Sequence, residues 1–173
     1  MLKKIVIIGP ESTGKSTLSK ALAEQLNTVW VPEYARTYLE QQGQEYQYDD
    51  LLAIAKGQLA SEDKWAQQAN KYLICDTDLY VLKVWSEHKY GKTDAFILES
   101  IAQRPYDAYI LCDIDMPWDE DPLREHPEPE MRRYFYHVYQ DIVVQSGMPF
   151  IIVRDSEKER LAQALAAPWF KQG

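Results

Sequence analysis

The chain has 173 residues, of which 46% are hydrophobic and 27% are charged, and its formal net charge at pH 7 is −8. This length suits one domain with a full hydrophobic core, and the composition is typical of a globular protein. A surplus of acidic residues repels the phosphate backbone of nucleic acids, which argues against a nucleic-acid partner. The apolar runs are too short for a membrane span or a signal-peptide core, which predicts a cytoplasmic protein with no membrane partner.

Short apolar segments alternate with helical patterns along the chain, which predicts a parallel sheet covered by helices on both faces. The expected strands are Lys4–Ile8, Thr28–Val31, Tyr72–Cys75, Ala108–Cys112 and Phe150–Val153. The expected helices are Lys15–Leu26, Tyr34–Gln42, Asp49–Asn70, Leu79–Lys89, Ala95–Gln103, Pro129–Ser146 and Lys158–Ala166. Asp49 or Asp50 is the expected N-cap of the third helix. We interpret residues 1–173 as a single α/β domain.

The first strand leads directly into Gly-Pro-Glu-Ser-Thr-Gly-Lys-Ser at positions 9–16, the spacing of a loop that cradles nucleotide phosphates. Gly9 lets the chain turn sharply, and Gly14 keeps side chains away while backbone N–H groups surround the phosphates. Lys15 supplies a mobile cation for the β- and γ-phosphates, and the Ser16 hydroxyl is placed to bind Mg²⁺. The predicted nucleotide site comprises Gly9, Glu11, Ser12, Thr13, Gly14, Lys15, Ser16 and Thr17.

Acidic residues follow two of the predicted strands, at the rim where open parallel sheets bind ligands. Asp76 has the position of a Walker-B-like carboxylate, which holds Mg²⁺ directly or through water. Asp78 either caps the next helix or contacts the acceptor, and the two roles are compatible. Glu33 could take a proton from a sugar hydroxyl that attacks the γ-phosphate, or form only a surface ion pair with Arg36. Arg36 could instead reach a phosphate.

Residues 113–129 contain four prolines, many acids and no helical period. Together with the first turn of the next helix they form a predicted lid at about residues 113–133. Such a lid could bring Arg124 over the transferring phosphoryl group. Arg132 and Arg133 lie about 100° apart on a helix, so at most one of them faces the site. Arg124 is therefore the predicted lid cation.

Tyrosine and tryptophan are abundant, with twelve and five residues. Trp85 or Trp118 could stack on a flat substrate ring, because aromatic faces pair well with rings and cations. The other three tryptophans are expected in the core: Trp30, Trp65 and Trp169. The histidines lack metal-ligand spacing and are assigned no role: His88, His126 and His137.

Five segments stand out in chain order: residues 9–17, Pro32-Glu33-Tyr34-Ala35-Arg36, Asp76-Thr77-Asp78, Pro117-Trp118 and Leu123-Arg124. Together they resemble the ribosylnicotinamide kinase domain of the NadR family of bacterial NAD-salvage proteins, over nearly the whole chain. The resemblance implies a P-loop, nucleoside-kinase-like three-layer sandwich with a five-stranded parallel sheet in the order 2-3-1-4-5. The chain differs from the family at Pro122, where the family pattern has Asp-Gly before Leu-Arg.

The strand order bears on the two cysteines, Cys75 and Cys112. The first strand would separate them, which places their backbones roughly 9 to 10 Å apart. That distance exceeds disulfide reach, so both are expected to be buried free thiols.

The resemblance further implies ATP as the phosphoryl donor and the ribose 5′-hydroxyl of nicotinamide riboside as the acceptor, which gives nicotinamide mononucleotide. We therefore expect three groups of residues: the catalytic residues Lys15, Glu33, Asp76 and Arg124, the Mg²⁺ site Ser16 and Asp76, and the acceptor site Glu33, Tyr34, Arg36, Asp78 and Trp118. Two alternatives stay open, a kinase for another nucleoside or nucleotide and a regulatory NTP-binding ATPase module. The sequence leaves the oligomeric state undecided.

Overall fold

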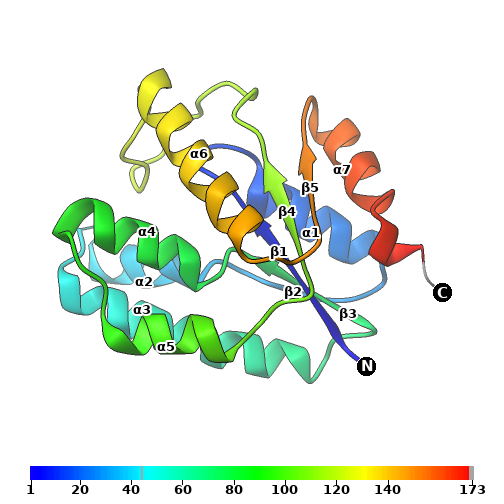
Figure 1. The fold of residues 1–173 in the computed structure, drawn as a ribbon, viewed down its shortest axis with the longest axis horizontal. Helices are drawn as coiled ribbons and strands as arrows, with labels where there is room; N and C mark the ends of the chain where they lie inside the picture. The colour runs from blue at the N-terminus through cyan, green and yellow to red at the C-terminus, as the bar shows by residue number, and fades with distance from the viewer. Residues whose placement is uncertain (44, 172–173) are drawn as a thin grey trace.

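Five parallel strands form one sheet in the order β2-β3-β1-β4-β5 (Figure 1). The structure is a computed structural model, and it describes residues 1–43 and 45–171. The strands are β1 (Lys3–Ile8), β2 (Trp30–Val31), β3 (Tyr72–Asp76), β4 (Ala108–Cys112) and β5 (Phe150–Val153). The order confirms the predicted fold class, and it places the carboxyl ends of β1, β2 and β3 side by side.

Helices cover both faces of this sheet (Figure 1). They are α1 (Lys15–Gln25), α2 (Tyr34–Gln42), α3 (Tyr48–Ala66), α4 (Leu79–Tyr90), α5 (Ala95–Gln103), α6 (Pro129–Gln145) and α7 (Glu157–Leu165). Side chains of α1 and α7 form one core with the sheet, and side chains of α4 and α6 form the second core on the other face. A third core joins α2, α3, α4 and α5.

The residues of β1 alternate between the two sheet faces. Ile5 and Ile7 belong to the core under α1 and α7, whereas Val6 and Ile8 belong to the core under α4 and α6. All four are completely buried, which explains why a central parallel strand reads as a continuous apolar run.

The two cysteines lie on the strands that flank β1 and belong to different cores. Cys75 of β3 packs on the α4 and α6 side, and Cys112 of β4 packs on the α1 and α7 side. Both are buried free thiols, as predicted.

Both predicted boundaries of the third helix, Asp49 and Asn70, are wrong, because α3 spans Tyr48–Ala66. Gln47 is the N-cap of α3 in place of Asp49 or Asp50, and its backbone N–H donates to Asp50 Oδ2 at 2.7 Å. Asp50, in the first turn of the helix, therefore accepts a hydrogen bond from the backbone of the N-cap residue. The helix ends at Ala66, and Ala69 continues the apolar spacing because it packs against the sheet from the following turn.

The second strand is shorter than predicted, because Thr28 is held by its side chain. Its hydroxyl donates to the carbonyl of Tyr72 at 2.6 Å and accepts from Asn70 N–H at 2.9 Å.

A 3₁₀ turn at Pro168–Phe170 was not predicted, and it places Trp169 in the core. Within residues 1–43 and 45–171, no helix is long and apolar enough to cross a membrane.

Candidate active site

The loop from β1 to α1 has the backbone conformation that its two glycines allow. Gly9 has a φ of +151°, and a Cβ there would lie only 2.8 Å from the carbonyl oxygen of Cys112. Gly14 is the N-cap of α1 with a φ of +75°, in the left-handed region that favours glycine. Side chains at either position would therefore distort the loop.

Internal hydrogen bonds hold this loop in a closed shape. Thr13 Oγ1 donates to the carbonyl of Pro10 at 2.8 Å, and Lys15 Nζ donates to the same oxygen at 2.6 Å. Ser12 has a φ of +57°, a conformation that costs energy for a residue with a side chain. These contacts and backbone angles together give the loop its curved shape.

Asp76, at the carboxyl end of β3, lies next to the start of α1. Ser16 Oγ donates a 2.6 Å hydrogen bond to its Oδ2, and its buried Oδ1 has no hydrogen-bond partner among the described residues. Burial raises the pKa of Asp76, whereas the Ser16 hydrogen bond and the charge of Lys15 act in the opposite direction. A buried carboxylate oxygen without a partner, beside a hydroxyl and a phosphate loop, fits a Mg²⁺ ion, which takes few protein ligands when phosphates supply the others.

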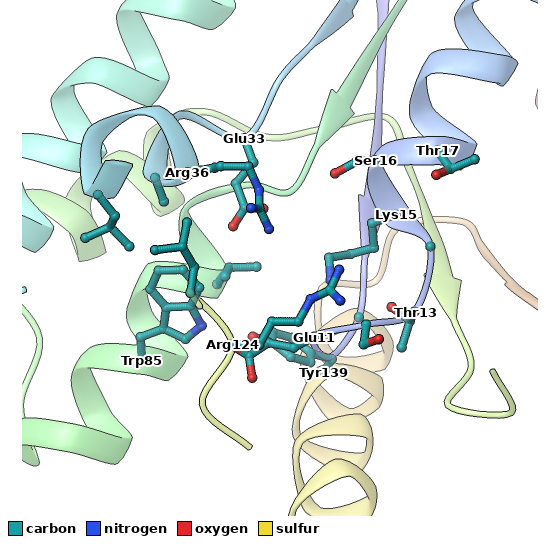
Figure 2. A pocket seen from close by; sticks show the side chains of 17 residues that line it. Glu11, Thr13, Lys15, Ser16, Thr17, Glu33, Arg36, Trp85, Arg124 and Tyr139 are labelled. Atoms are coloured by element: carbon teal, nitrogen blue, oxygen red, sulfur yellow. The ribbon is translucent and has the colours of Figure 1, made fainter. Parts of the chain in front are cut away.

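Glu33 follows β2 and is the N-cap residue of α2. Burial, together with the nearby negative charge of Asp76, raises the pKa of Glu33 to about 7, although Lys15 and Arg36 lower it. Figure 2 shows Glu33 and Arg36 on one side of a cavity and Lys15 and Ser16 on the other. A carboxyl group with a raised pKa thus faces the phosphate loop.

This phosphate cavity has a volume of about 130 Å³. Its walls come from the phosphate loop, the start of α2, α4, the lid and α6. The lining residues are Gly9, Glu11, Ser12, Thr13, Gly14, Lys15, Ser16, Thr17, Glu33, Ala35, Arg36, Leu39, Val81, Trp85, Leu123, Arg124 and Tyr139. All eight residues of the predicted nucleotide site are among them.

Asp78 is buried at the start of α4. It caps α4 by accepting from Tyr80 N–H at 3.0 Å, and its other oxygen accepts from the Tyr109 hydroxyl at 3.1 Å. Burial raises its pKa to about 7. Asp78 and Glu33 share the lining of a small adjoining hollow. The cap is thus observed, and a contact with the acceptor stays a prediction.

Backbone N–H groups of the lid donate to two side chains of the phosphate loop. Asp119 N–H donates to Ser12 Oγ at 2.8 Å, and the N–H groups of Glu125 and His126 donate to the carboxylate of Glu11 at 3.2–3.3 Å. These bonds hold residues 119–126 over the loop that is expected to bind phosphates.

Pro122, the position at which the chain differs from the family pattern, lies in a tight turn of this lid. Asp121 Oδ1 accepts from Leu123 N–H at 2.9 Å, and its other oxygen pairs with Arg36 Nη1 at 3.0 Å. Arg36 therefore contacts the lid, and its ion pairs in the described chain are with Asp121 and Glu40 instead of Glu33.

The lid carries Arg124 into the phosphate cavity, where Figure 2 shows its side chain. Its guanidinium donates to the backbone carbonyl of Asp119 and lies 3.8 Å from the carboxylate of the same residue. Of the two arginines at the start of α6, Arg133 is exposed, whereas Arg132 donates to the carbonyl of Ser12.

The structure separates the aromatic candidates. Trp85 lines the phosphate cavity and stacks on Tyr46, with ring centroids 6.0 Å apart. Trp118 instead lies under the guanidinium of Arg132, at 5.8 Å. The Tyr34 ring lies against Gly57 of α3, where an added Cβ would be 2.0 Å from it. Neither Trp118 nor Tyr34 is among the lining residues of the described cavities.

Sequence reasoning missed a second, larger cavity of about 280 Å³ beside the first. The two share Glu11, Leu39, Trp85, Leu123 and Tyr139. The further lining residues include Tyr46, His88, Lys89, His126 and Phe135. We call it the aromatic cavity. It is built from the phosphate loop, the lid, the loop before α3 and the helices α2, α4 and α6, and no local sequence pattern connects these segments.

Arg160 of α7 was also missed, although it is only 1% exposed. It donates to the carbonyl of Thr13 in the phosphate loop at 3.0 Å. A lone arginine in the pattern of a surface helix carries no signal for such a role.

Comparison with known proteins agrees with this geometry. The family described as "AAA domain" matches residues 4–160. The "Trifunctional NAD biosynthesis/regulator protein NadR" of Salmonella typhimurium is 29% identical over 160 residues, and so is the protein of the same name from Escherichia coli. Each alignment covers 90% of this chain and 39% of the relative, so the chain spans well under half the length of these proteins.

Solved structures show the same fold. A crystal structure of NadR protein in complex with NR superposes with a TM-score of 0.76 at 24% identity, covering 94% of this chain and 49% of that one. A thymidylate kinase from Ehrlichia chaffeensis superposes with a TM-score of 0.62 at 17% identity, covering 95% and 97% of the two chains. The chain belongs to the AAA domain family and is a P-loop α/β domain homologous to part of NadR.

Proposed function

We propose that this chain is an ATP- and Mg²⁺-dependent kinase that phosphorylates the ribose 5′-hydroxyl of nicotinamide riboside and so forms nicotinamide mononucleotide. One observation carries the proposal: Glu33 faces the phosphate loop across a single cavity. Its burial there, with Asp76 nearby, raises its pKa to about 7. A general base works best when its pKa lies near the working pH, and this carboxyl group has that property.

The residues of the cavity divide the chemistry between them. Loop N–H groups and the N-terminus of α1 bind the polyphosphate, while Lys15 and Arg124 offset the charge of the transferring group. Glu33 accepts the proton of the attacking hydroxyl. Ser16 and Asp76 would hold Mg²⁺, which when bound adds positive charge at the phosphate oxygens.

The walls suit an acceptor that is both flat and cationic, as nicotinamide riboside is. Trp85 and Tyr139 line both cavities, and the carboxylates of Glu11 and Glu33 lie beside them. Aromatic faces and carboxylates both attract a cationic ring. The homology to NadR, and the NadR structure in complex with NR, support the same acceptor.

A nucleotide acceptor is less well supported. It would need a further cation for its own phosphate, and Arg36 is the rim residue suited to that task. Arg36 already pairs with Asp121 at 3.0 Å. We therefore propose that the main role of Arg36 is to bind the lid through Asp121.

The test is ADP release from ATP and Mg²⁺ with nicotinamide riboside and a panel of other nucleosides. We expect many-fold stimulation by nicotinamide riboside and formation of its 5′-monophosphate. If a different nucleoside stimulates ADP release, that nucleoside is the acceptor and the assignment of nicotinamide riboside is wrong. If no nucleoside changes the rate of ADP release, a regulatory ATPase is favoured.

Lys15→Ala and Lys20→Ala are a matched pair for this assay, because both change a lysine of α1. Lys15 lines the cavity, whereas Lys20 is exposed on the same helix. Loss of a cation that stabilises the transferring group costs about 10²- to 10³-fold in turnover. We expect that loss for Lys15→Ala and wild-type turnover for Lys20→Ala.

A further inference from the structure

Arg160 is a charged side chain inside the protein that the proposed chemistry does not use. Four groups surround its guanidinium. Nη1 donates to the carbonyl of Thr13 at 3.0 Å, Nη2 to the carbonyl of Asp113 at 3.2 Å, and Nε to the carbonyl of Asp155 at 2.9 Å. Nη2 also pairs with the carboxylate of Asp115. One side chain of α7 thereby connects the phosphate loop to the segments after β4 and β5.

Arg132 makes an equivalent contact from α6. Its Nη2 donates to the carbonyl of Ser12 at 3.2 Å and to the carbonyl of Met116 at 3.0 Å. The ring of Trp118 lies on the other side of this guanidinium. Two arginines therefore bind the carbonyls of two successive loop residues.

The two arginines approach the loop from outside the phosphate cavity. Neither is among its lining residues, although Arg132 lines the adjoining aromatic cavity. They come from helices that cover opposite faces of the sheet, since α7 belongs to one core and α6 to the other. Their contacts with the loop are to backbone oxygens, so they act on the direction of peptide groups.

The geometry of the peptide bond gives these contacts a consequence. In a trans peptide the carbonyl and the following N–H point in opposite directions. A carbonyl of Ser12 held by Arg132 directs the N–H of Thr13 to the other side, and a carbonyl of Thr13 held by Arg160 does the same for the N–H of Gly14. Ser12 has a left-handed backbone conformation, which costs energy for a residue with a side chain, so the contacts from outside the loop help to hold it there.

We propose that Arg132 and Arg160 are positioning residues of the phosphate loop. By binding the carbonyls of Ser12 and Thr13, they direct the N–H groups of the next residues, Thr13 and Gly14, toward the nucleotide phosphates. The proposal rests on the nucleotide-binding part of the proposed function and is independent of the acceptor. Arginine suits this role because its rigid fork presents five donors, whereas lysine presents one point charge.

The experiment measures the Kd of ADP and of inorganic tripolyphosphate, each with Mg²⁺, by isothermal titration of the full chain. Arg160→Gln and Arg132→Gln should each raise both Kd values about tenfold or more, the value of one misdirected hydrogen bond to a charged group. Arg154→Gln is the control, because Arg154 contacts the side chain of Asp113 at 2.6 Å and is largely exposed. Its Kd values should equal those of the wild type.

Two further measurements separate positioning from stability or charge. In steady-state assays the KM for ATP should rise in both variants, and in Arg160→Gln the KM for the nucleoside should stay unchanged, because Arg160 lines neither the phosphate cavity nor the aromatic cavity. Arg160→Lys should not restore ADP affinity, because a lysine keeps the charge and loses the fork. Full rescue by lysine would overturn the proposal.

Circular dichroism and the unfolding temperature show whether each variant is folded. If Arg160→Gln does not fold, Arg132→Gln decides, since that residue is only half-buried and binds two carbonyls. Wild-type Kd values in a folded Arg132→Gln protein would overturn the proposal. A wild-type chain that binds ADP but does not phosphorylate nicotinamide riboside would refute the acceptor alone.

Discussion

The hydroxyl of Ser16 donates to the carboxylate of Asp76 across 60 positions of sequence, at a distance of 2.6 Å. This bond joins the first turn of α1 to the end of β3. It brings together the two side chains that the sequence assigned to Mg²⁺, and it leaves Asp76 Oδ1 without a partner among the described residues.

Asp76→Asn should weaken the response to Mg²⁺. The amide keeps an acceptor for Ser16 and removes the negative charge, so the Mg²⁺ concentration for half-maximal turnover should rise at least about tenfold. A magnesium titration of kcat at saturating ATP measures this shift. Asp107→Asn, which alters an exposed carboxylate before β4, is the control. An unchanged magnesium dependence in Asp76→Asn would remove Asp76 from the metal site.

Glu33 should determine the acid limb of the pH profile. Its pKa is raised to about 7, so below that pH the carboxyl group is protonated and cannot accept the hydroxyl proton. In the wild type kcat/KM should rise with pH through about 7. In Glu33→Gln this rise of kcat/KM with pH should be absent, and kcat should fall about 10²-fold. The Kd of ADP should change little. An equal loss of turnover and ADP binding would point to a folding defect instead.

Arg124→Ala should lower kcat without changing the KM for the nucleoside. Its guanidinium reaches the phosphate cavity from the lid, where it can offset charge that develops during transfer. We expect a loss of about 10²-fold in kcat. Arg133→Ala changes an exposed arginine nearby and should have wild-type kinetics. Similar kinetics for the two variants would contradict a catalytic role for Arg124.

Asp78→Asn should change how stability depends on pH. The folded protein raises the pKa of this buried carboxyl group from 3.8 to about 7, so its stabilising contribution is complete below about pH 4 and is lost as the pH rises through 7. Asparagine does not titrate and can still accept from Tyr80 N–H. The free energy of unfolding of the variant, relative to the wild type, should therefore increase between pH 4 and 8, by about 1.4 kcal/mol per unit of pKa shift. Urea titrations at several pH values measure it, and a difference independent of pH would refute the assignment.

Much of the fold was predictable because the signals are local. The completely buried strand β1 and the motif after it define the centre of the sheet, and the boundaries of α2, α5, β4 and β5 agree with the structure. Two of the errors occur where side chains replace backbone contacts. Thr28 shortens β2 with its hydroxyl, and Gln47 begins α3 ahead of the two aspartates.

The positions of the candidate residues were predictable where these follow the ends of strands, as for Glu33 and Asp76. It was not predictable where distant segments meet. The aromatic cavity joins Tyr46 of the loop before α3 to His126 of the lid, and only the tertiary packing brings them together. The same holds for Arg160, whose partners lie 5 to 147 positions away.

Gly57 has a consequence for the opposite wall of the site. This residue lies in α3, and Tyr34 rests against it because no side chain intervenes. The neighbouring Gln58 accepts from the N–H of Tyr34 at 2.9 Å, so the residue directly after Glu33 is held from two sides. Adding even one methyl group there would push α2 outward and carry Glu33 with it. The spacing between Glu33 and the phosphate loop is thus set, in part, by a glycine in a helix that does not line the phosphate cavity.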